Sequence, residues 1–394
     1  MTIKMILMIF LFFFVQPLFL VGLFYAFWNR RKRLAYVRET YRMNFNRSAF
    51  EFSDYFFKAL VIALIASGLS LLIGVPLTLE WYFLYQGITI LLLVFFGSRF
   101  IHPVFTFSLT SLALFLLNHF DLNFLSQRLK TGNDYLVQFD FFPDQLSSLL
   151  LNSLFFITIL LFLSSLLMKN KDRTKLYPIL RESKRGKRVA KYQNKWLWLL
   201  PLLLVVPGSM IEPIAPWWPL LSIGGEKFGI LLLPILLGFQ FTISTQLIEE
   251  AIRSIRKDLQ FLALFAGLLF LLSYFYPAVT VWTFVLLLIA GVFVLYRHRQ
   301  RENKWTFKYG PSCGGLRVIS VKADSPADRM GLTMGAVITH MNDKAIDNKE
   351  EFYEILSYNR SYVKLRLERP DGEVIMTETP LYDDDANHLG LLLL

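Results

Sequence analysis

Residues 278–296 read AVTVWTFVLLLIAGVFVLY and are followed at once by the basic segment RHRQR, residues 297–301. The run contains no charged residue, and its length is close to the about 20 residues that a helix needs to cross a hydrocarbon core of roughly 30 Å. A long apolar helix that ends in cations is typical of a membrane span with its basic end in the cytoplasm. This stretch therefore predicts a membrane protein.

Comparable apolar runs recur on the N-terminal side of this stretch. The chain has 394 residues, of which 55% are hydrophobic and 18% charged, whereas a soluble chain carries roughly 25% charged residues. The first run is too long for a signal peptide, and its basic cluster follows it, so we expect it to remain as a helix. We predict nine spans, with seven or eight also open: 5–28, 56–75, 81–99, 103–118, 146–168, 196–211, 228–247, 259–276 and 278–296.

Basic residues follow the first, fifth, seventh and ninth of these runs. The positive-inside rule then places the segments 29–55 and 169–195 in the cytoplasm as basic loops, and the N-terminus outside. Residues 305–394 hold 10 Lys or Arg against 14 Asp or Glu, so the net charge of +11 belongs to the membrane part. Because the positive charge is concentrated in the membrane part, we do not expect nucleic acid as a partner. This distribution leaves two interpretations of the basic loops, simple topology determinants or a surface for anionic lipids.

Little in the membrane part indicates transport or catalysis. Ionisable residues are scarce within the runs, and the amides of Asn152, Gln86, Gln240 and Gln246 are expected to bond between helices. The five histidines form no His-Glu-x-x-His pair for a zinc protease. We expect no cofactor and no metal site, and the lone Cys313 excludes an intramolecular disulfide.

A G-x-S-x-G pattern occurs at Gly310–Gly314, with Ser312 at its centre. A nucleophile elbow needs a strand before the serine and a helix after it. Here a strand-like run, residues 316–321, follows instead. We therefore predict that Ser312 is not catalytic and that the protein is not an enzyme.

The C-terminal part, residues 305–394, reads as a small α+β domain. Strands are expected at 316–321, 363–367 and 374–379, and a helix at 348–358, with a turn at Pro370-Asp371-Gly372. The fold class predicted for the whole chain is thus a polytopic α-helical membrane protein, residues 1–304, followed by a small α+β domain in the cytoplasm. The apolar tail 389–394 is interpreted as an additional strand, or else as a self-ligand.

The order Gly315-Leu316, Ser325-Pro326-Ala327, Gly331-Leu332 and Gly335 to Ile338 resembles the bacterial PDZ domain over about 80 residues, although Ala336 stands where many members have Asp. A PDZ domain implies a groove in which a C-terminal or strand-forming peptide adds to an open sheet edge. The peptide-binding residues expected from this pattern are Gly314, Gly315, Leu316, Arg317, Val318, Phe352 and Ile355.

A many-helix membrane body with one C-terminal PDZ domain resembles the MinJ family of cell-division topological determinants of low-GC Gram-positive bacteria. The resemblance implies a non-enzymatic adaptor that bridges the polar scaffold DivIVA to MinD and restrains FtsZ-dependent septation. It also implies a cell-membrane location enriched at septa and poles. Two other functions stay open, a PDZ-containing regulatory subunit of a protease or signalling system and a transporter.

Overall fold

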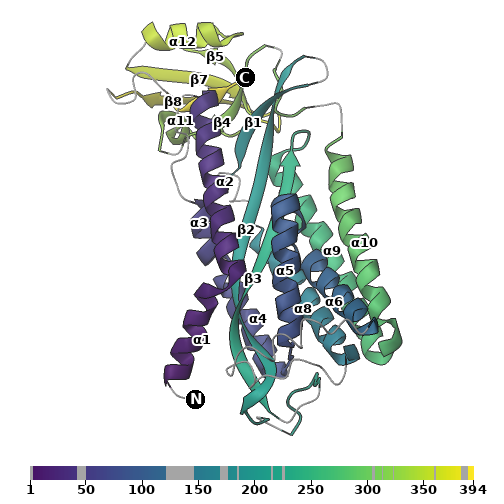
Figure 1. Ribbon diagram of the computed structural model, residues 1–394. Coiled ribbons are helices and arrows are strands. Elements are labelled where there is room, and N and C mark those ends of the chain that lie inside the picture. The colour runs from purple at the N-terminus through teal and green to yellow at the C-terminus, as the bar shows by residue number, and fades with distance from the viewer. Residues whose placement is uncertain are drawn as a thin grey trace.

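The computed structural model describes residues 3–41, 50–120, 146–168, 176–183, 186–213, 216–223, 227–303, 307–312, 314–322, 324–358, 361–382 and 389–394. Residues 121–145 between two predicted spans, the first part of the predicted loop 169–195, Cys313 and residues 383–388 lie outside these residues. Figure 1 shows an elongated body of helices and two long strands, with the C-terminal sheet at one end and the N-terminus at the other.

The helices follow the apolar runs closely, although their number differs from the prediction. Among the described residues five helices are long and apolar enough to cross a membrane, or six if the bent pair α1 and α2 forms one span. At 17 residues α6 is short for a bilayer. The bounds are α1 Ile3–Val15, α2 Pro17–Tyr41, α3 Phe50–Ser53, η1 Asp54–Lys58, α4 Leu60–Ile73, α5 Leu79–Phe96, η2 Gly97–Phe100, α6 Pro103–His119, α8 Leu146–Leu167, α9 Ile248–Phe275, η4 Pro277–Val279 and α10 Thr280–Arg301.

Two of the nine predicted spans, 196–211 and 228–247, are strands, and the prediction of helices there is wrong. They belong to an antiparallel sheet of order β1-β2-β3, formed by Tyr177–Glu182, Arg188–Ile211 and Phe228–Ile243. The segment 169–195, predicted to be a basic loop, contains β1 and the start of β2, so that prediction is wrong there. The segment 29–55, also predicted to be a loop, consists largely of the C-terminal part of α2 and the whole of α3. Each long strand runs the length of the body, as the expected helix would have done (Figure 1).

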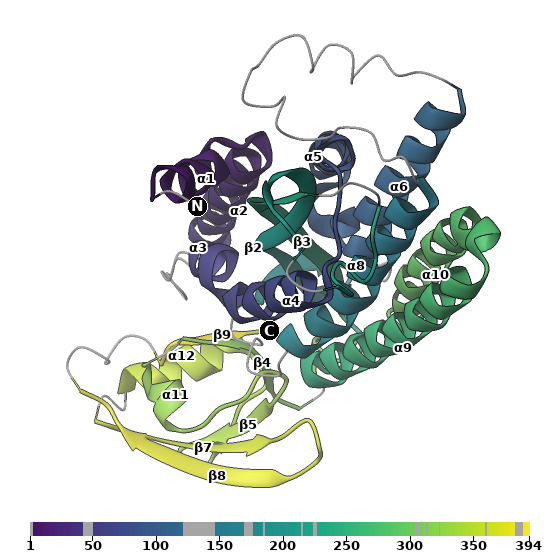
Figure 2. The same cartoon turned by 90° about the horizontal axis from the view of Figure 1, so that it is seen from below.

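Helices cover both faces of the β2–β3 hairpin, with α1 and α2 on one side and α8 on the other (Figure 2), which explains why the sequence pattern was misinterpreted. Leu200, Leu204, Leu233 and Leu236 are all at most 1% exposed. A strand that is buried on both faces reads as a continuous apolar run, and such a run does not distinguish a strand from a buried helix. The sequence therefore lacks the alternation that marks a half-exposed strand.

The outer edge of β2 finds its hydrogen-bond partners on the neighbouring N-terminal segments. The Leu203 N–H donates to Ser67 Oγ of α4 over 3.0 Å, and the Leu77 N–H donates to the Val205 carbonyl over 2.9 Å. Successive residues of a strand point their backbone groups to alternate edges, so Pro201 shares the outward edge with these two residues. It has no N–H to satisfy there.

The outer edge of β3 is closed in the same way. The Leu236 N–H donates to the Tyr85 hydroxyl of α5 over 3.1 Å, and the Gly238 N–H donates to the Ile101 carbonyl over 2.8 Å. Pro234 lies on the same outward edge and pairs in register with Pro201. Lipid cannot hydrogen-bond an open sheet edge, so these partners allow a sheet to lie among membrane helices.

Three of the four amides expected to bond between helices do bond to a distant segment, but their partners lie in turns and at helix breaks or ends, not within helices. Asn152 Nδ2 donates to the carbonyls of Pro76 and Leu221 over 2.7 and 3.0 Å, and Gln86 Nε2 donates to Gln16 Oε1 over 3.3 Å. Gln246 Nε2 donates to Glu302 Oε1 over 3.0 Å. The fourth amide, Gln240, instead lines a pocket.

The C-terminal domain has its own apolar core, separate from that of the body. Its sheet has the order β8-β7-β5-β4-β9, with β6 paired to β5. The elements are β4 Leu316–Val321, α11 Pro326–Arg329, β5 Val337–Met341, β6 Lys344–Ala345, α12 Lys349–Tyr358, β7 Tyr362–Glu368, β8 Val374–Pro380 and β9 Leu391–Leu393. The three strands and the helix predicted for this domain are thus found. The Ser325 side chain caps α11 by accepting the Asp328 N–H.

Candidate functional site: the PDZ sheet edge and its docking on the membrane body

Strand β4, beside which the sequence predicts an open edge, is paired on both sides. It pairs with β5 on one edge and with the C-terminal strand β9 on the other, antiparallel in both cases. Arg317 and Leu394 exchange two backbone hydrogen bonds of 3.1 and 2.9 Å, and the Lys322 N–H donates to the Gly390 carbonyl over 2.8 Å. The prediction of an open edge at β4 is therefore wrong for this structure. The chain's own tail is the strand that occupies it.

The other predicted groove residues lie mainly in the domain core. Leu316 and Val318 on β4 and Phe352 on α12 are buried, and Ile355 packs against them. A β-strand and a helix that form a PDZ groove also form the core beneath it, so the sequence pattern alone does not separate the two roles.

The two glycines before β4 differ in their surroundings. Gly314 has φ +81° and open space where a Cβ would lie. At Gly315, with φ +154°, a Cβ would meet the Ile338 carbonyl oxygen at 2.6 Å and Val337 Cγ1 at 2.7 Å. A side chain at Gly315 would therefore disturb the β4–β5 pairing before it could block a peptide.

Arg317 joins the segment before β4 to the turn before β5. Its Nε donates to the Gly310 carbonyl over 2.8 Å and its Nη1 to the Gly335 carbonyl over 3.0 Å. Burial lowers the pKa of Arg317, and nearby Glu368 acts in the opposite direction. The guanidinium thus stabilises the loop that precedes the sheet.

Ser312 lies in this same segment, and the strand β4 follows it after three residues. In the described residues 314–322 a strand and not a helix follows the serine, whereas a nucleophile elbow needs a helix there.

Two tyrosines fix the PDZ domain on the end of the β1-β2-β3 sheet. The Tyr192 hydroxyl of β2 donates to the Ile319 carbonyl of β4, and the Tyr309 hydroxyl accepts the Ile248 N–H of α9 over 3.1 Å. Their rings meet edge to face at 4.6 Å between centroids. Burial raises the pKa of Tyr309 to about 12, so its hydroxyl remains protonated at neutral pH.

The tail contributes to this docking as well. Leu391 and Leu393 point into the PDZ core, whereas Leu392 and Leu394 pack against the apolar core of the body. Ile319 of β4 faces the body beside them. The strand β9 therefore completes the PDZ sheet and also forms part of the contact with the membrane body.

The end of the body that carries the PDZ domain is also its basic end. The end of α2, the β1–β2 turn, the start of α9 and the end of α10 all lie there (Figure 1). Buried Asp258 of α9 accepts two hydrogen bonds from Arg301, of 2.6 and 3.0 Å, and lies 3.3 Å from Arg297. The Glu302 carboxylate accepts the N–H groups of Ser244 and Thr245. The described basic segments thus share one end, as their spacing predicts.

Comparison with known proteins agrees with this architecture. Residues 317–369 match the family model of the PDZ domain. The fold class is therefore that of a polytopic α-helical membrane protein with a C-terminal PDZ domain, as predicted, with the β2–β3 hairpin as an addition. A solved PDZ domain, of the SdrC-like protein from Listeria monocytogenes, is 22% identical and covers 21% of this chain and 90% of its own, with a TM-score of 0.19.

Two curated proteins that this chain resembles share one name, MinJ. The chain is 30% identical over 215 residues to the cell division topological determinant MinJ of Bacillus subtilis (strain 168), which covers 55% of this chain and 54% of that protein. It is 26% identical over 226 residues to the probable MinJ of Lacticaseibacillus paracasei, which covers 55% of this chain and 58% of that protein. The match thus spans little more than half the length of these relatives. The resemblance to MinJ-type division determinants is confirmed.

Proposed function

We propose that this chain is a non-enzymatic membrane adaptor in cell-division site selection, which bridges the polar scaffold DivIVA to MinD and so restrains FtsZ-dependent septation. The observation that carries the proposal is the similarity to two proteins named MinJ, combined with a PDZ domain fixed to a membrane body. A peptide-binding module held at the basic end of a helical body is suited to assemble partners at the bilayer surface.

The proposal places the PDZ domain in the cytoplasm and the protein at septa and poles. Support for the first part is the common location of the basic segments and the PDZ domain at one end of the body, since cytoplasmic ends of membrane proteins are rich in Lys and Arg. The second part rests on the resemblance to MinJ-type division determinants.

A genetic experiment tests the role in division. Deletion of the gene in its own organism should produce septa near the poles, and expression of the intact chain should restore mid-cell septa. A fluorescent fusion should collect at septa. If the deletion strain divides normally, or if the fusion spreads evenly over the membrane, the proposed function is refuted.

The proposed peptide site is the β4 edge, with Gly314 to Val318 on one side and α12 on the other. Because β9 occupies this edge, a partner strand would bind there by replacing the tail. The tail strand has only three residues, so it offers few hydrogen bonds in competition with a longer peptide.

A reversible crosslink tests this strand exchange. Val318 and Leu393 are paired across the two strands, and both are buried in the PDZ core. Directly paired strand residues have Cα atoms about 4.5–5.5 Å apart, within the range that a disulfide spans. Val318→Cys with Leu393→Cys, in a Cys313→Ser background, should therefore lock the tail when oxidised and release it when reduced.

Binding of purified DivIVA and MinD to this full-length variant would be measured in detergent in both redox states. We expect at least one partner to bind the reduced form and to lose most of its affinity for the oxidised form. The two single-cysteine variants are the controls, since neither forms the intramolecular bond. Equal binding by the locked and released forms would show that the partners do not bind at the β4 edge.

A further inference from the structure

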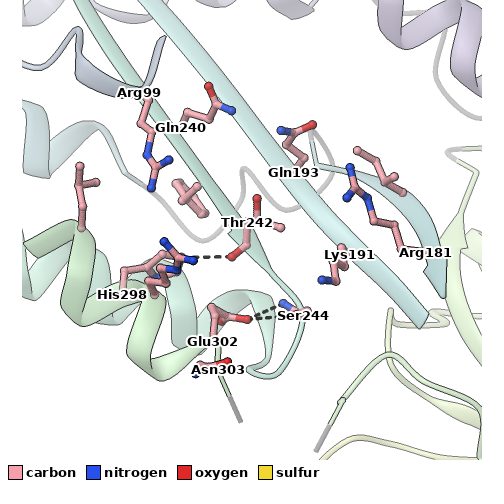
Figure 3. Close-up of a pocket in the computed structure, with 14 residues that line it drawn as sticks. Arg99, Arg181, Lys191, Gln193, Gln240, Thr242, Ser244, His298, Glu302 and Asn303 are labelled. Atoms are coloured by element: carbon pink, nitrogen blue, oxygen red, sulfur yellow. Dashed lines mark hydrogen bonds between the residues drawn. The ribbon is translucent and has the colours of Figure 1, made fainter. Parts of the chain in front are cut away.

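A pocket of about 430 Å³ lies at the PDZ-bearing end of the body, between the β1-β2-β3 sheet, η2 and the end of α10. Figure 3 shows Arg99 on one side of it and Arg181 and Lys191 on the other, with Gln193 and Gln240 on the strands between them. None of these five residues belongs to the PDZ contact described above. The pocket is built from elements that are far apart in the sequence.

The strand register explains why polar side chains gather here. Gln193 is paired with Thr242, and Lys191 with Ile179, so these residues lie on the same face of the sheet. Gln240 lies two residues from Thr242 along β3 and shares that face. This end of the sheet is thus polar on the pocket side, although the strands are apolar farther along.

The pocket carries an excess of positive charge. Arg99, Arg181, Lys191 and Arg299 line it, and within the described ranges none of these four cations forms an ion pair. The carboxylate at the rim, Glu302, already accepts backbone N–H groups from the turn before α9. Unpaired cations with amide donors beside them are suited to bind an anion with several oxygen acceptors.

The pocket lies at the level of lipid headgroups, where β2 changes from polar to apolar residues. Trp196 and Trp198 stack on each other at 5.6 Å between ring centroids, and the Lys58 ammonium lies 4.7 and 4.9 Å from their rings. From Trp196 to Val206 the strand carries no charged residue, so this part of β2 lies at the depth of the hydrocarbon core. Lys191 and Gln193 of the pocket come just before these tryptophans on β2 and so lie on the aqueous side.

The side of the pocket between η2 and α10 adjoins a lipid-facing surface. Helix α6 packs against α10 near Gly291, where a Cβ would meet Val104 and Phe105, and α10 then continues to Arg301. Phe95 of α5, four residues before Arg99, is 75% exposed, and Phe293 of α10, six residues before Arg299, is 59% exposed. Large exposed apolar side chains on a membrane protein contact acyl chains.

We propose that this pocket binds the headgroup of an anionic phospholipid, with the phosphodiester among Arg99, Arg181, Lys191 and Arg299 and the acyl chains against α5 and α10. Lipid is favoured over free phosphate because the cations and the exposed apolar surface adjoin each other. Basic pockets between transmembrane elements bind acidic headgroups in this way. The site is a specific addition to the general attraction of basic loops for a membrane.

Native mass spectrometry of the full-length protein in detergent tests the site. Wild-type protein would be titrated with phosphatidylglycerol, and separately with phosphatidylcholine. We expect one phosphatidylglycerol to be retained in preference to phosphatidylcholine. Arg99→Gln combined with Arg299→Gln should weaken retention roughly 30-fold, since each juxtamembrane cation contributes about a fivefold factor.

The matched control is Arg256→Gln combined with Lys257→Gln, which removes two exposed charges from α9 at the same end of the body. This control should retain the lipid as the wild type does, and both variants should unfold at the wild-type temperature. Equal retention by pocket variant and control, or no preference of the wild type for phosphatidylglycerol, would overturn the proposal. Displacement of the lipid by millimolar glycerol 3-phosphate alone would assign the pocket to a free phosphate instead.

Discussion

Replacement of Tyr85 by phenylalanine tests whether helices close the edge of the β2–β3 hairpin. The Tyr85 hydroxyl accepts the Leu236 N–H over 3.1 Å, and both residues are fully buried. Phenylalanine keeps the ring, which stacks on Trp81 at 5.5 Å and meets Phe107 at 5.2 Å between centroids. The substitution therefore removes the acceptor and leaves the packing in place.

The expected cost follows from the N–H that loses its acceptor. A buried donor left without a partner destabilises a folded protein by about 1–3 kcal/mol, and neither water nor lipid can replace the hydroxyl at this position. We therefore expect Tyr85→Phe to lower the free energy of unfolding by about 2 kcal/mol. This corresponds to a roughly 30-fold change in the unfolding equilibrium.

Unfolding of the purified protein in mixed micelles, driven by a denaturing detergent, would measure this difference. Hydrogen exchange across residues 232–240 would report whether the strand edge opens locally. The control is Tyr274→Phe on α9, where the side chain is 54% exposed and a change within about 0.5 kcal/mol is expected. If Tyr85→Phe matches this control in both stability and exchange, the hairpin edge is not closed by α5 and the account of the sheet is wrong.

Three further results are expected. Asp258→Asn should lower the free energy of unfolding by about 1–3 kcal/mol, because it removes the charge that pairs with Arg301 and Arg297; an unchanged detergent-denaturation midpoint would contradict this. A reporter fused after Leu394 should behave as cytoplasmic, and alkaline phosphatase activity of such a fusion would disprove the orientation. Ser312→Ala should leave septum placement unchanged, whereas labelling of Ser312 by a fluorophosphonate would show a nucleophile that we do not expect.

Helices could be predicted from the sequence wherever a continuous apolar run was long enough to cross a bilayer and formed a helix. Helices lie at 60–73, 79–96, 103–119, 146–167, 248–275 and 280–301, where six of the spans are predicted, and α1 and α2 together cover the first predicted span. The same criterion failed at 196–211 and 228–247, because leucine-rich strands covered on both faces have the composition of a membrane helix. Pro201 and Pro234 were the available signal, since proline in the middle of a helix removes a hydrogen bond.

The candidate site could be predicted only in part. Turn and strand signals gave the PDZ elements, including a strand-like tail at 389–394. The pairing of that tail with the β4 edge depends on contacts between residues 70 to 75 positions apart, which no local pattern encodes. The basic pocket was missed for the same reason, since Gln193 and Gln240 come together only through the register of the sheet and Arg99 reaches them from η2.

The edge contacts of the hairpin also bear on the order in which the protein can be made. Ser67, Leu77, Tyr85 and Ile101, which close the two edges, all precede β2 in the chain. The ribosome therefore synthesises the segments that close the sheet edges before it synthesises β2 and β3. Loss of an early helix would release into lipid a hairpin with unpaired backbone groups, whereas truncation after the hairpin would spare these four partners. Defects in assembly should accordingly be most severe when they arise near the start of the gene.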